Sequence, residues 1–215
     1  MGVPKNYANQ LREALGAKAV WEPGSPVQLG DILTERDGSF NPSGRLSEYG
    51  IKLETATNQN VKLNLRSSGT SERVFQAGVE VSPGALKPEV EASVEYAFKG
   101  EFEYALKSDD IDVDMIVNVN QVAKAVLGVD EWRHEKWYIV ERVYRSGQWS
   151  FLGSRKTSKS FKISGKGSAI GQFLNIGASA GISRSGSIDL ELLGEGGALA
   201  MRVVRIRKDG TTDRG

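Results

Sequence analysis

The sequence predicts an α+β fold, a single domain whose twisted, mainly antiparallel β-sheet carries two long amphipathic β-hairpins and a few short helices. The chain has 25 glycines but only 6 prolines, which suits many tight turns between strands. Apolar and polar residues alternate with a period of two in two regions, 73–106 and 172–193. No change in composition marks a linker, so we treat residues 1–215 as one domain with a polar tail at 208–215.

The N-terminal part predicts one helix and several short strands. Residues 5–15 have helical spacing, with Gly16 placed to end the helix. We expect this helix to pack on a sheet, and a lipid-contacting helix is the alternative. Strands are expected over 17–21 and 27–33 and in the alternating stretch 51–65. The apolar side of the helix consists of Tyr7, Leu11, Ala14 and Leu15.

The first amphipathic hairpin is centred on Val90–Leu106. Every even position of this stretch except Gly100 is apolar, while most odd positions are acidic or small. Side chains alternate between the faces of a strand, so one long strand with an apolar and an acidic face is expected. At about 3.3 Å per residue it could extend over roughly 55 Å. Residues 74–81 form the partner arm, and the apolar residues assigned to this hairpin are Phe75, Ala77, Val79, Val81, Val90, Ala92, Val94, Tyr96 and Phe98.

The middle of the chain contains an aspartate cluster and a second helix. Asp109, Asp110, Asp112 and Asp114 alternate along the chain, and a solvated edge strand is the interpretation we favour. A calcium loop is the alternative, but the glycine and distal glutamate of an EF-hand are absent. Residues 119–127 predict a helix capped by Asn118 or Asn120.

Signatures of catalysis or cofactor binding are missing from the sequence. His134 is the only histidine and there is no cysteine, which argues against a zinc site. A Ser-His-Asp triad is arithmetically possible, but we place His134 at a helix-to-strand corner rather than in a catalytic site. The glycines of 165–171 lack the order of a phosphate-binding loop. We therefore expect no catalytic residue, metal or cofactor.

Positive charge is concentrated in the C-terminal half. Residues 1–132 hold 13 basic and 20 acidic side chains, whereas residues 133–208 hold 14 basic and 5 acidic. Such a half can attract phosphates of lipid or nucleic acid, or it can simply attract the acidic half. Strands are expected over 136–144 and 149–153, followed by a basic run. We assign contact with acidic lipid to Arg155, Lys156, Lys159, Lys162 and Lys166.

The second amphipathic hairpin is expected over residues 171–193. Its arms alternate around a turn at 183–186, and the face opposite the apolar one is small and polar. A closing strand follows over 198–208. The apolar residues assigned to this hairpin are Leu174, Ile176, Ala178, Ala180, Ile182, Ile188, Leu190 and Leu192.

The apolar faces of the two hairpins must be covered. Burial of one large apolar side chain contributes about 1.5–3 kcal/mol, so roughly ten of them rival the stability of a whole domain. A helix or a second sheet can cover them in one state, and lipid can cover them in another. Four strands cannot close a barrel alone, so insertion would require many copies, with the glutamates facing water.

The order of these segments resembles the pore-forming domain of bacterial gasdermins. The resemblance runs from LREALGAKAVWEPGSPVQLGDIL and GRLSEYG, through SSGTSERVFQAGVEV and VEASVEYAF, to VNQVAKAVL and KWYIVERVYRSGQWSFLGSRKTSKSFKI. It continues in FLNIGASAGISRSGSIDLELL and ALAMRVVRIR. It implies a non-enzymatic protein that oligomerises on a membrane and inserts two β-hairpins per protomer as a large β-barrel, in cell death or antiphage defence.

The resemblance also implies partners and a location. They are further copies of the chain on activation, membrane lipid and a regulatory protein, without nucleic acid, in the cytoplasm when soluble and at the inner membrane when active. Two features depart from the family: there is no cysteine to acylate, and only residues 208–215 follow the closing strand, where an inhibitory tail is usual. The first hairpin is also unusually acidic. The alternative is a soluble β-rich self-assembling or protein-binding module, such as a ring or tube component.

Overall fold

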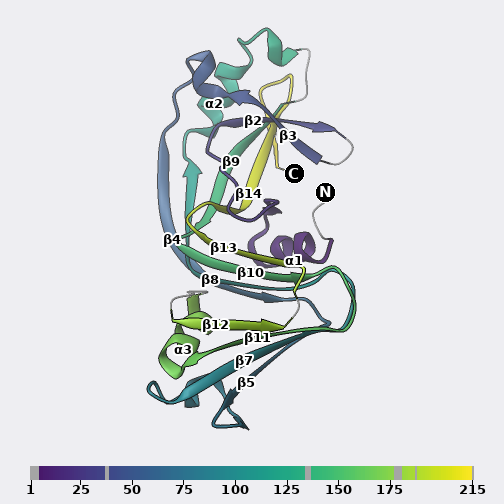
Figure 1. The fold of residues 1–215 in the computed structure, drawn as a ribbon. Coiled ribbons are helices and arrows are strands. Elements are labelled where there is room, and N and C mark those ends of the chain that lie inside the picture. Colours follow the sequence, from purple (N-terminus) through teal and green to yellow (C-terminus); the bar gives the residue numbers. More distant parts are fainter. Residues whose placement is uncertain (1–4, 37–38, 134–136, 177–180, 187, 215) are drawn as a thin grey trace.

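A computed structural model describes residues 5–36, 39–133, 137–176, 181–186 and 188–214. Within these residues the chain forms two antiparallel sheets and three α-helices, which confirms the α+β class. The larger sheet bends through the upper and middle parts of the molecule, and the smaller sheet lies below it (Figure 1). The expected sites at His134, Ala178 and Ala180 lie outside the described residues.

The strands divide unequally between the sheets. The path through the larger sheet is β1-β14-β9-β8-β10-β13, with β2, β3, β4 and β15 attached to it, and the smaller sheet has the order β12-β11-β7-β5-β6. The larger sheet contains β1 (Lys18–Ala19), β2 (Asp31–Arg36), β3 (Ser39–Arg45), β4 (Thr55–Arg66), β8 (Glu103–Ile116), β9 (Trp137–Ser146), β10 (Gln148–Ser154), β13 (Leu190–Glu195), β14 (Ala198–Ile206) and β15 (Thr212–Arg214). The smaller sheet contains β5 (Thr70–Gln76), β6 (Val79–Glu80), β7 (Glu91–Phe98), β11 (Lys159–Lys166) and β12 (Ile182–Gly186).

Two of the three α-helices close the larger sheet. Helix α1 (Lys5–Leu15) has the expected bounds and buries Tyr7 and Leu11 against β8 and β10, so it is a helix packed on a sheet. Helix α2 (Val119–Val126) buries three apolar side chains at the other end of the sheet. The third helix, α3 (Gly167–Ile176), packs against the smaller sheet. Short 3-10 turns occur at η1 (Leu46–Tyr49), η2 (Pro83–Ala85) and η3 (Glu131–Arg133).

Strands β9 and β14 form the most deeply buried part of the larger sheet. Side chains on both of their faces are buried, including Val140, Val143 and Val203. The high β-propensity of 136–144 and 198–206 therefore corresponds to strands enclosed on two sides.

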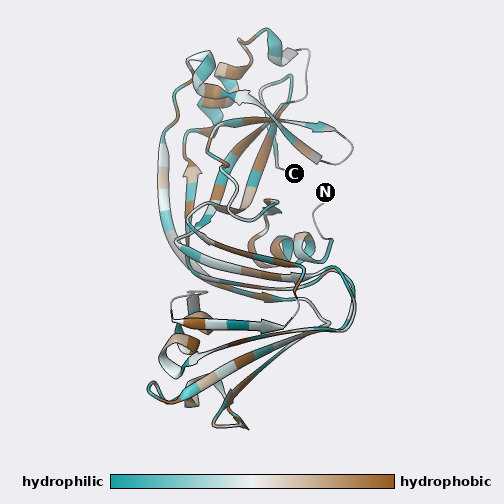
Figure 2. Cartoon of the chain, viewed as in Figure 1, coloured by the Kyte–Doolittle hydropathy of each residue, from teal (hydrophilic) through white to brown (hydrophobic). Residues whose placement is uncertain are grey.

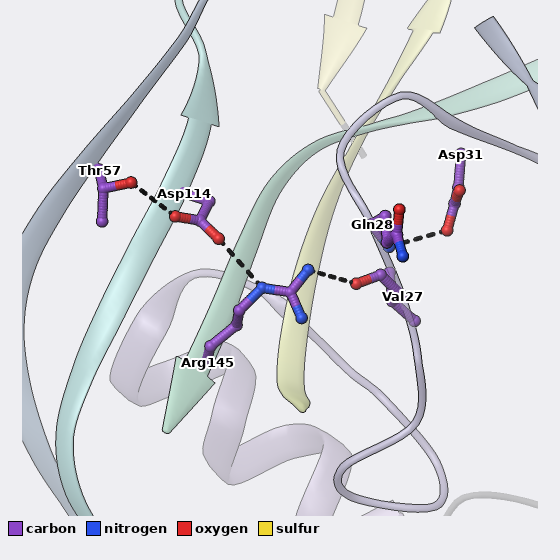
Figure 3. A network of polar contacts seen from close by, with 6 residues as sticks. All are labelled: Val27, Gln28, Asp31, Thr57, Asp114 and Arg145. Atoms are coloured by element: carbon purple, nitrogen blue, oxygen red, sulfur yellow. Dashed lines mark hydrogen bonds and ion pairs between the residues drawn. The ribbon is translucent and has the colours of Figure 1, made fainter. Parts of the chain in front are cut away.

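Strand β8 is central, so the expectation of a solvated edge strand at residues 109–114 is wrong. It pairs with β4, β9 and β10. Two of its aspartates, Asp109 and Asp114, are instead bound within the sheet. Asp114 accepts a hydrogen bond from Thr57 at 2.7 Å and forms an ion pair with Arg145 at 3.0 Å (Figure 3). Arg145 also donates to the carbonyl of Val27 at 2.7 Å, which fixes the segment before β2.

Candidate functional site

Four strands of the larger sheet continue into the smaller sheet in the same order. The neighbours β4, β8, β10 and β13 correspond to β5, β7, β11 and β12, and each pair is joined by a short connection. The connections span residues 67–69, 99–102 and 155–158, with residues 188–189 leading into β13, and the first three lie along one edge of the molecule (Figure 1). The smaller sheet is therefore the folded-back half of a four-stranded sheet, and we call these connections the bends.

The two central strands keep their register through the bend. In the larger sheet Glu103 pairs with Ser154, and in the smaller sheet Phe98 pairs with Lys159. Phe98 and Glu103 are five positions apart, as are Ser154 and Lys159. The β7–β8 and β10–β11 strands could therefore straighten side by side without slipping along each other.

The outer strands do not share this matched register. Arg66 pairs with Ala105 and Thr70 with Phe98, so four positions of the β4–β5 strand oppose seven of the β7–β8 strand. On the other side, the β12–β13 strand is also offset from its neighbour. Of these neighbouring strand pairs, the central pair has equal lengths of chain on the two strands between the sheets.

The central bends also change which face of each strand carries apolar side chains. Tyr104 and Leu106 of β8 pack in the α1 cluster, whereas Val94 and Tyr96 of β7 pack under α3, although all four occupy even positions. Both central bends contain a non-glycine residue in the left-handed region, Phe102 with φ 57° in one and Ser158 with φ 57° in the other. In a straight strand the even residues would return to one face.

A single helix covers the apolar face of the smaller sheet. Phe173 of α3 lies 1 % exposed with its ring centroid 6.4 Å from that of Tyr96. Ile170 and Leu174 complete the contact, and Ala105 and Leu152 of the larger sheet join from the other side. The strands show alternating hydrophobic and hydrophilic bands (Figure 2). The cover that the sequence required in the folded state is therefore a helix and part of the second sheet.

The first hairpin differs from its predicted form in two ways. The strand expected over Val90–Leu106 ends at Phe98, turns, and restarts at Glu103 in the other sheet. The predicted arm 74–81 is two strands, because Ala77 and Gly78 both have positive φ and form the turn between β5 and β6.

The apolar face assigned to residues 75–81 is also wrong. Val74 pairs with Val94 and is buried, whereas Phe75 pairs with Ser93 on the opposite face of the smaller sheet. Ala77 is exposed at the turn, Val79 is 64 % exposed, and Val81 packs at the edge of the α3 cluster. Val90 is 37 % exposed, while Ala92, Val94, Tyr96 and Phe98 are buried as a row. Register decides the face, and the sequence of β5 alone could not reveal its register.

The second hairpin is not a hairpin in this structure. Its first arm is helix α3, which contains Leu174 and ends at Ile176, and β12 and β13 pair with β11 and β10 rather than with each other. Ile182 and Ile188 pack at the α3 cluster, and Leu190 and Leu192 pack at the α1 cluster. The helix forms because Ile170, Phe173 and Leu174 have i, i+3, i+4 spacing and pack against the apolar face of β7 and β11.

The basic run lies on β11 and its bend. Lys162 forms an ion pair with Glu95 at 3.2 Å, and Lys166 forms one with Glu89 at 3.4 Å. Arg155 and Lys156 are exposed in the bend, and Lys159 begins β11 half-buried. Contact of these side chains with acidic lipid stays a prediction, as does insertion of the apolar rows.

Two carboxylates bind backbone donors at the bends. The Glu103 side chain lies against Gly69 and Gly100, and the Gly69 N–H donates to Glu103 Oε2 at 3.2 Å. Asp189 accepts from the Arg155 N–H at 2.8 Å and from the Ser154 hydroxyl at 3.1 Å. These bonds, the Arg155 N–H first, lower the pKa of Asp189. Each carboxylate thus stabilises the folded-back path of the chain.

A buried ion pair joins the two sheets. Lys107 Nζ of β8 lies 2.8 Å from Glu72 Oε2 of β5, with 3 % and 9 % of the two side chains exposed. The Tyr96 hydroxyl donates to the same carboxylate at 2.6 Å, and Arg66 approaches it at 3.5 Å. Burial lowers the pKa of Lys107, opposed by the nearby Glu72. In the sequence, Lys107 merely follows the apolar residues Tyr104, Ala105 and Leu106, and this signal is too weak to assign a partner.

Metal and small-molecule sites find little support in the described residues. Within those ranges no three His, Cys, Asp or Glu side chains are grouped to hold a metal ion. Asp109, one of the aspartates considered for calcium, accepts hydrogen bonds from Ser146 and from the Gln148 N–H instead.

A groove of about 610 Å³ lies between residues 49–54 and α2, lined by Tyr49, Ile51, Leu53, Gln121, Val122 and Val129 among others. In the part of the chain that the structure describes, no helix has the length and apolar character to span a bilayer.

Solved structures resemble this arrangement at low similarity. A bacterial gasdermin from Bradyrhizobium tropiciagri aligns with 98 % of this chain and 91 % of its own, at 13 % identity and a TM-score of 0.40. The Gasdermin A3 membrane pore aligns with 97 % of this chain and 92 % of its own, at 10 % identity and a TM-score of 0.36. No protein-family model and no curated protein sequence matches the chain. Both structures come from the family that the sequence resembles, and similarity at this level transfers no function.

Proposed function

We propose that this protein forms pores in membranes, and that the folded-back strands extend to insert. The matched register of the two central strands carries this proposal, because surface bends in the folded state do not need equal lengths. Two loops on the surface can differ in length at little cost. Two strands that must pair along their whole extended length cannot, because a slip of one residue turns every side chain to the other face.

Extension would gather the apolar residues of the central strands on one face. Even positions of the β7–β8 strand and odd positions of the β10–β11 strand would share it, since cross-strand partners lie on the same side. The opposite face would carry the charged pairs Glu95–Lys162 and Glu91–Lys166 toward water. The shared apolar row consists of Ala92, Val94, Tyr96, Phe98, Phe102, Tyr104, Leu106, Trp149, Phe151, Phe161 and Ile163.

The bend would lie at the membrane surface and the smaller sheet within the bilayer. A membrane strand needs about 9–11 residues, and β7 and β11 have 8 each. The link before β7 and an unwound α3 would supply the rest, consistent with insertion of residues assigned to both hairpins. Arg155 and Lys159, which fall on the apolar side of the extended strand, would then meet acidic headgroups rather than lipid tails.

Insertion requires several copies of the chain. Four strands leave unpaired edges in lipid, and only closure into a ring removes them. Among the described residues the outer edges of β4 and β13 are unpaired, and these strands run antiparallel to each other. The edge of one copy can therefore meet the opposite edge of the next without breaking the alternation of strand direction, as ring assembly requires.

The family resemblance of the sequence extends the proposal to its setting. We propose that the protein is cytoplasmic when soluble and moves to the inner membrane when active, that a regulatory protein controls it, and that it acts in cell death or antiphage defence. None of these follows from the geometry, and each depends on pore formation.

Release of a dye from anionic vesicles tests the proposal. The full chain is added before and after limited proteolysis, alongside Val90→Asp and the matched control Glu91→Gln. Val90 is half-exposed in the folded state, so a charge there is tolerated, yet in an extended strand it faces lipid at a cost of several kcal/mol. We expect leakage from wild type and Glu91→Gln but not from Val90→Asp. Absence of leakage under every condition, together with ordered oligomers in solution, would favour the self-assembling module instead.

A further inference from the structure

Lys107 and Glu72 form a deeply buried ion pair, with 3 % and 9 % of their side chains exposed. By contrast, the ion pair Lys162–Glu95 on the smaller sheet leaves close to half of each side chain exposed. Lys107 is 2 % exposed, in the row of β8 and β10 that faces the smaller sheet, next to the buried Ser150. A charged side chain at such a position requires a partner, and Glu72 is that partner.

The pair crosses from one sheet to the other rather than bracing either of them. Lys107 belongs to β8, in the larger sheet, while Glu72 and Tyr96 belong to β5 and β7, in the smaller sheet. Arg66, the last residue of β4, lies 3.5 Å from the same carboxylate. Two cations of the larger sheet and one hydroxyl of the smaller sheet thus converge on Glu72, close to the bend between β4 and β5.

We propose that Glu72 and Lys107 are a latch that holds the smaller sheet folded back on the larger one. The consequence of opening rests on the proposed pore function, whereas the latch itself concerns the folded protein. Every straight arrangement of β4–β5 and β7–β8 separates the two halves that this pair connects, so the ion pair must break before the strands extend. Lys107 occupies an odd position of β8, so in the extended strand it would lie on the face opposite the apolar row, in contact with water.

The latch differs from an ordinary stabilising contact in its response to substitution. Removal of Lys107 leaves the buried Glu72 carboxylate with only the Tyr96 hydroxyl and Arg66 at 3.5 Å, without the close cation of the intact pair, and the sheets relieve this loss by separating. Replacement of both partners by apolar residues of similar size removes the charge and the penalty together. The single and double substitutions therefore act in opposite directions on opening.

Hydrogen–deuterium exchange of the full chain tests the latch without a membrane. In Lys107→Met we expect amides of β5, β7 and β11 to exchange on the order of a hundredfold faster, while amides of β9 and β14 keep their protection. The double variant Lys107→Met with Glu72→Leu should restore protection of the smaller sheet. Tyr96→Phe, which keeps the ion pair and removes one hydrogen bond, is a milder variant that should give a smaller change in the same strands.

The outcomes separate the latch from the pore. Equal loss of protection in β9 and β7, or no rescue in the double variant, would overturn the latch and leave the pore proposal standing if wild type leaks vesicles. Faster exchange confined to the smaller sheet supports the latch even if no variant leaks, in which case the pore proposal fails alone. If both hold, Lys107→Met should also release dye from anionic vesicles at least tenfold faster than wild type, and the double variant should not.

Discussion

The two sheets are built from continuous strands, yet they are held in different ways. In the larger sheet, β9 and β14 are buried on both faces and closed by α1 and α2. In the smaller sheet, one face meets a helix of 10 residues, and the other carries polar side chains such as Arg73 and Lys162. The same four strands therefore contribute to two largely separate cores, one on each side of the bends.

Two phenylalanines of equal burial offer the largest test of that separation. Phe151 packs against Tyr7, Trp21 and Tyr104 in the larger core, and Phe173 packs against Tyr96 in the smaller one, each 1 % exposed. Either change to alanine should cost about 3–5 kcal/mol. Phe151→Ala should lower the midpoint of a single unfolding transition, whereas Phe173→Ala should open the smaller sheet first and leave the rest folded.

Urea unfolding followed by tryptophan fluorescence and by limited proteolysis distinguishes these outcomes. The four tryptophans report the larger sheet and its flanks, because none lies in the smaller sheet. If Phe173→Ala shifts the fluorescence transition as far as Phe151→Ala does, the two cores unfold together and the contrast between the sheets is lost.

The bend itself is the next test. A Cβ at Gly69 would lie 2.2 Å from Glu103 Oε1, so Gly69→Ala must displace the carboxylate and break its bond from the Gly69 N–H. Loss of a hydrogen bond to a charged group costs about 1.5–3 kcal/mol. Denaturant midpoints should show this loss for Gly69→Ala but not for Gly84→Ala, whose Cβ would meet nothing within 4 Å. Equal midpoints for both variants would mean that Glu103 contributes nothing to the bend.

The exposed ion pair on the smaller sheet should contribute much less. Lys162 and Glu95 are 45 % and 44 % exposed, so solvent screens their attraction. Lys162→Met is expected to change the free energy of unfolding by less than about 1 kcal/mol. If Lys162→Met changed the free energy of unfolding as much as Lys107→Met does, burial would not determine how much these ion pairs contribute to stability.

The smallest effect should come from acid at the outer bend. Bonds from Arg155 and Ser154 lower the pKa of Asp189 in the folded state, so its contribution is present above the ordinary pKa of 3.8 and disappears as the pH falls through the lowered value. Thermal midpoints between neutral pH and about pH 3 should therefore fall slightly more for wild type than for Asp189→Asn. Parallel curves would mean that these bonds add no stability.

Local pattern was enough to predict much of the larger sheet and its helices. Residues 5–15 have one apolar side and a terminating glycine, and they form α1 with the expected bounds. The run at 136–144 was predicted to be a strand from its β-branched and aromatic residues, and the closing strand expected over 198–208 is β14 (Ala198–Ile206). Asn118 precedes α2 as expected, although its side chain accepts from Glu54 rather than from the helix.

The smaller sheet was harder to predict, because its sequence fits two conformations. In residues 167–182, Leu174 satisfies both the period of a strand and the spacing of a helix with Ile170, so α3 could not be distinguished from a hairpin arm. The alternation through Gly100 and Phe102 predicted one strand where the chain bends. Contacts between distant strands, such as Lys107 with Glu72, depend on register and leave no local pattern.

The equal lengths of the two central bends limit how this chain can vary. A residue inserted between Phe98 and Glu103 would lengthen a surface loop of the folded protein, and we expect little change in its expression or thermal stability. In the extended ribbon the same residue would turn one strand over relative to its neighbour. A second insertion between Ser154 and Lys159 would restore the match. If the strands extend as proposed, the lengths at these two places should therefore change together or not at all.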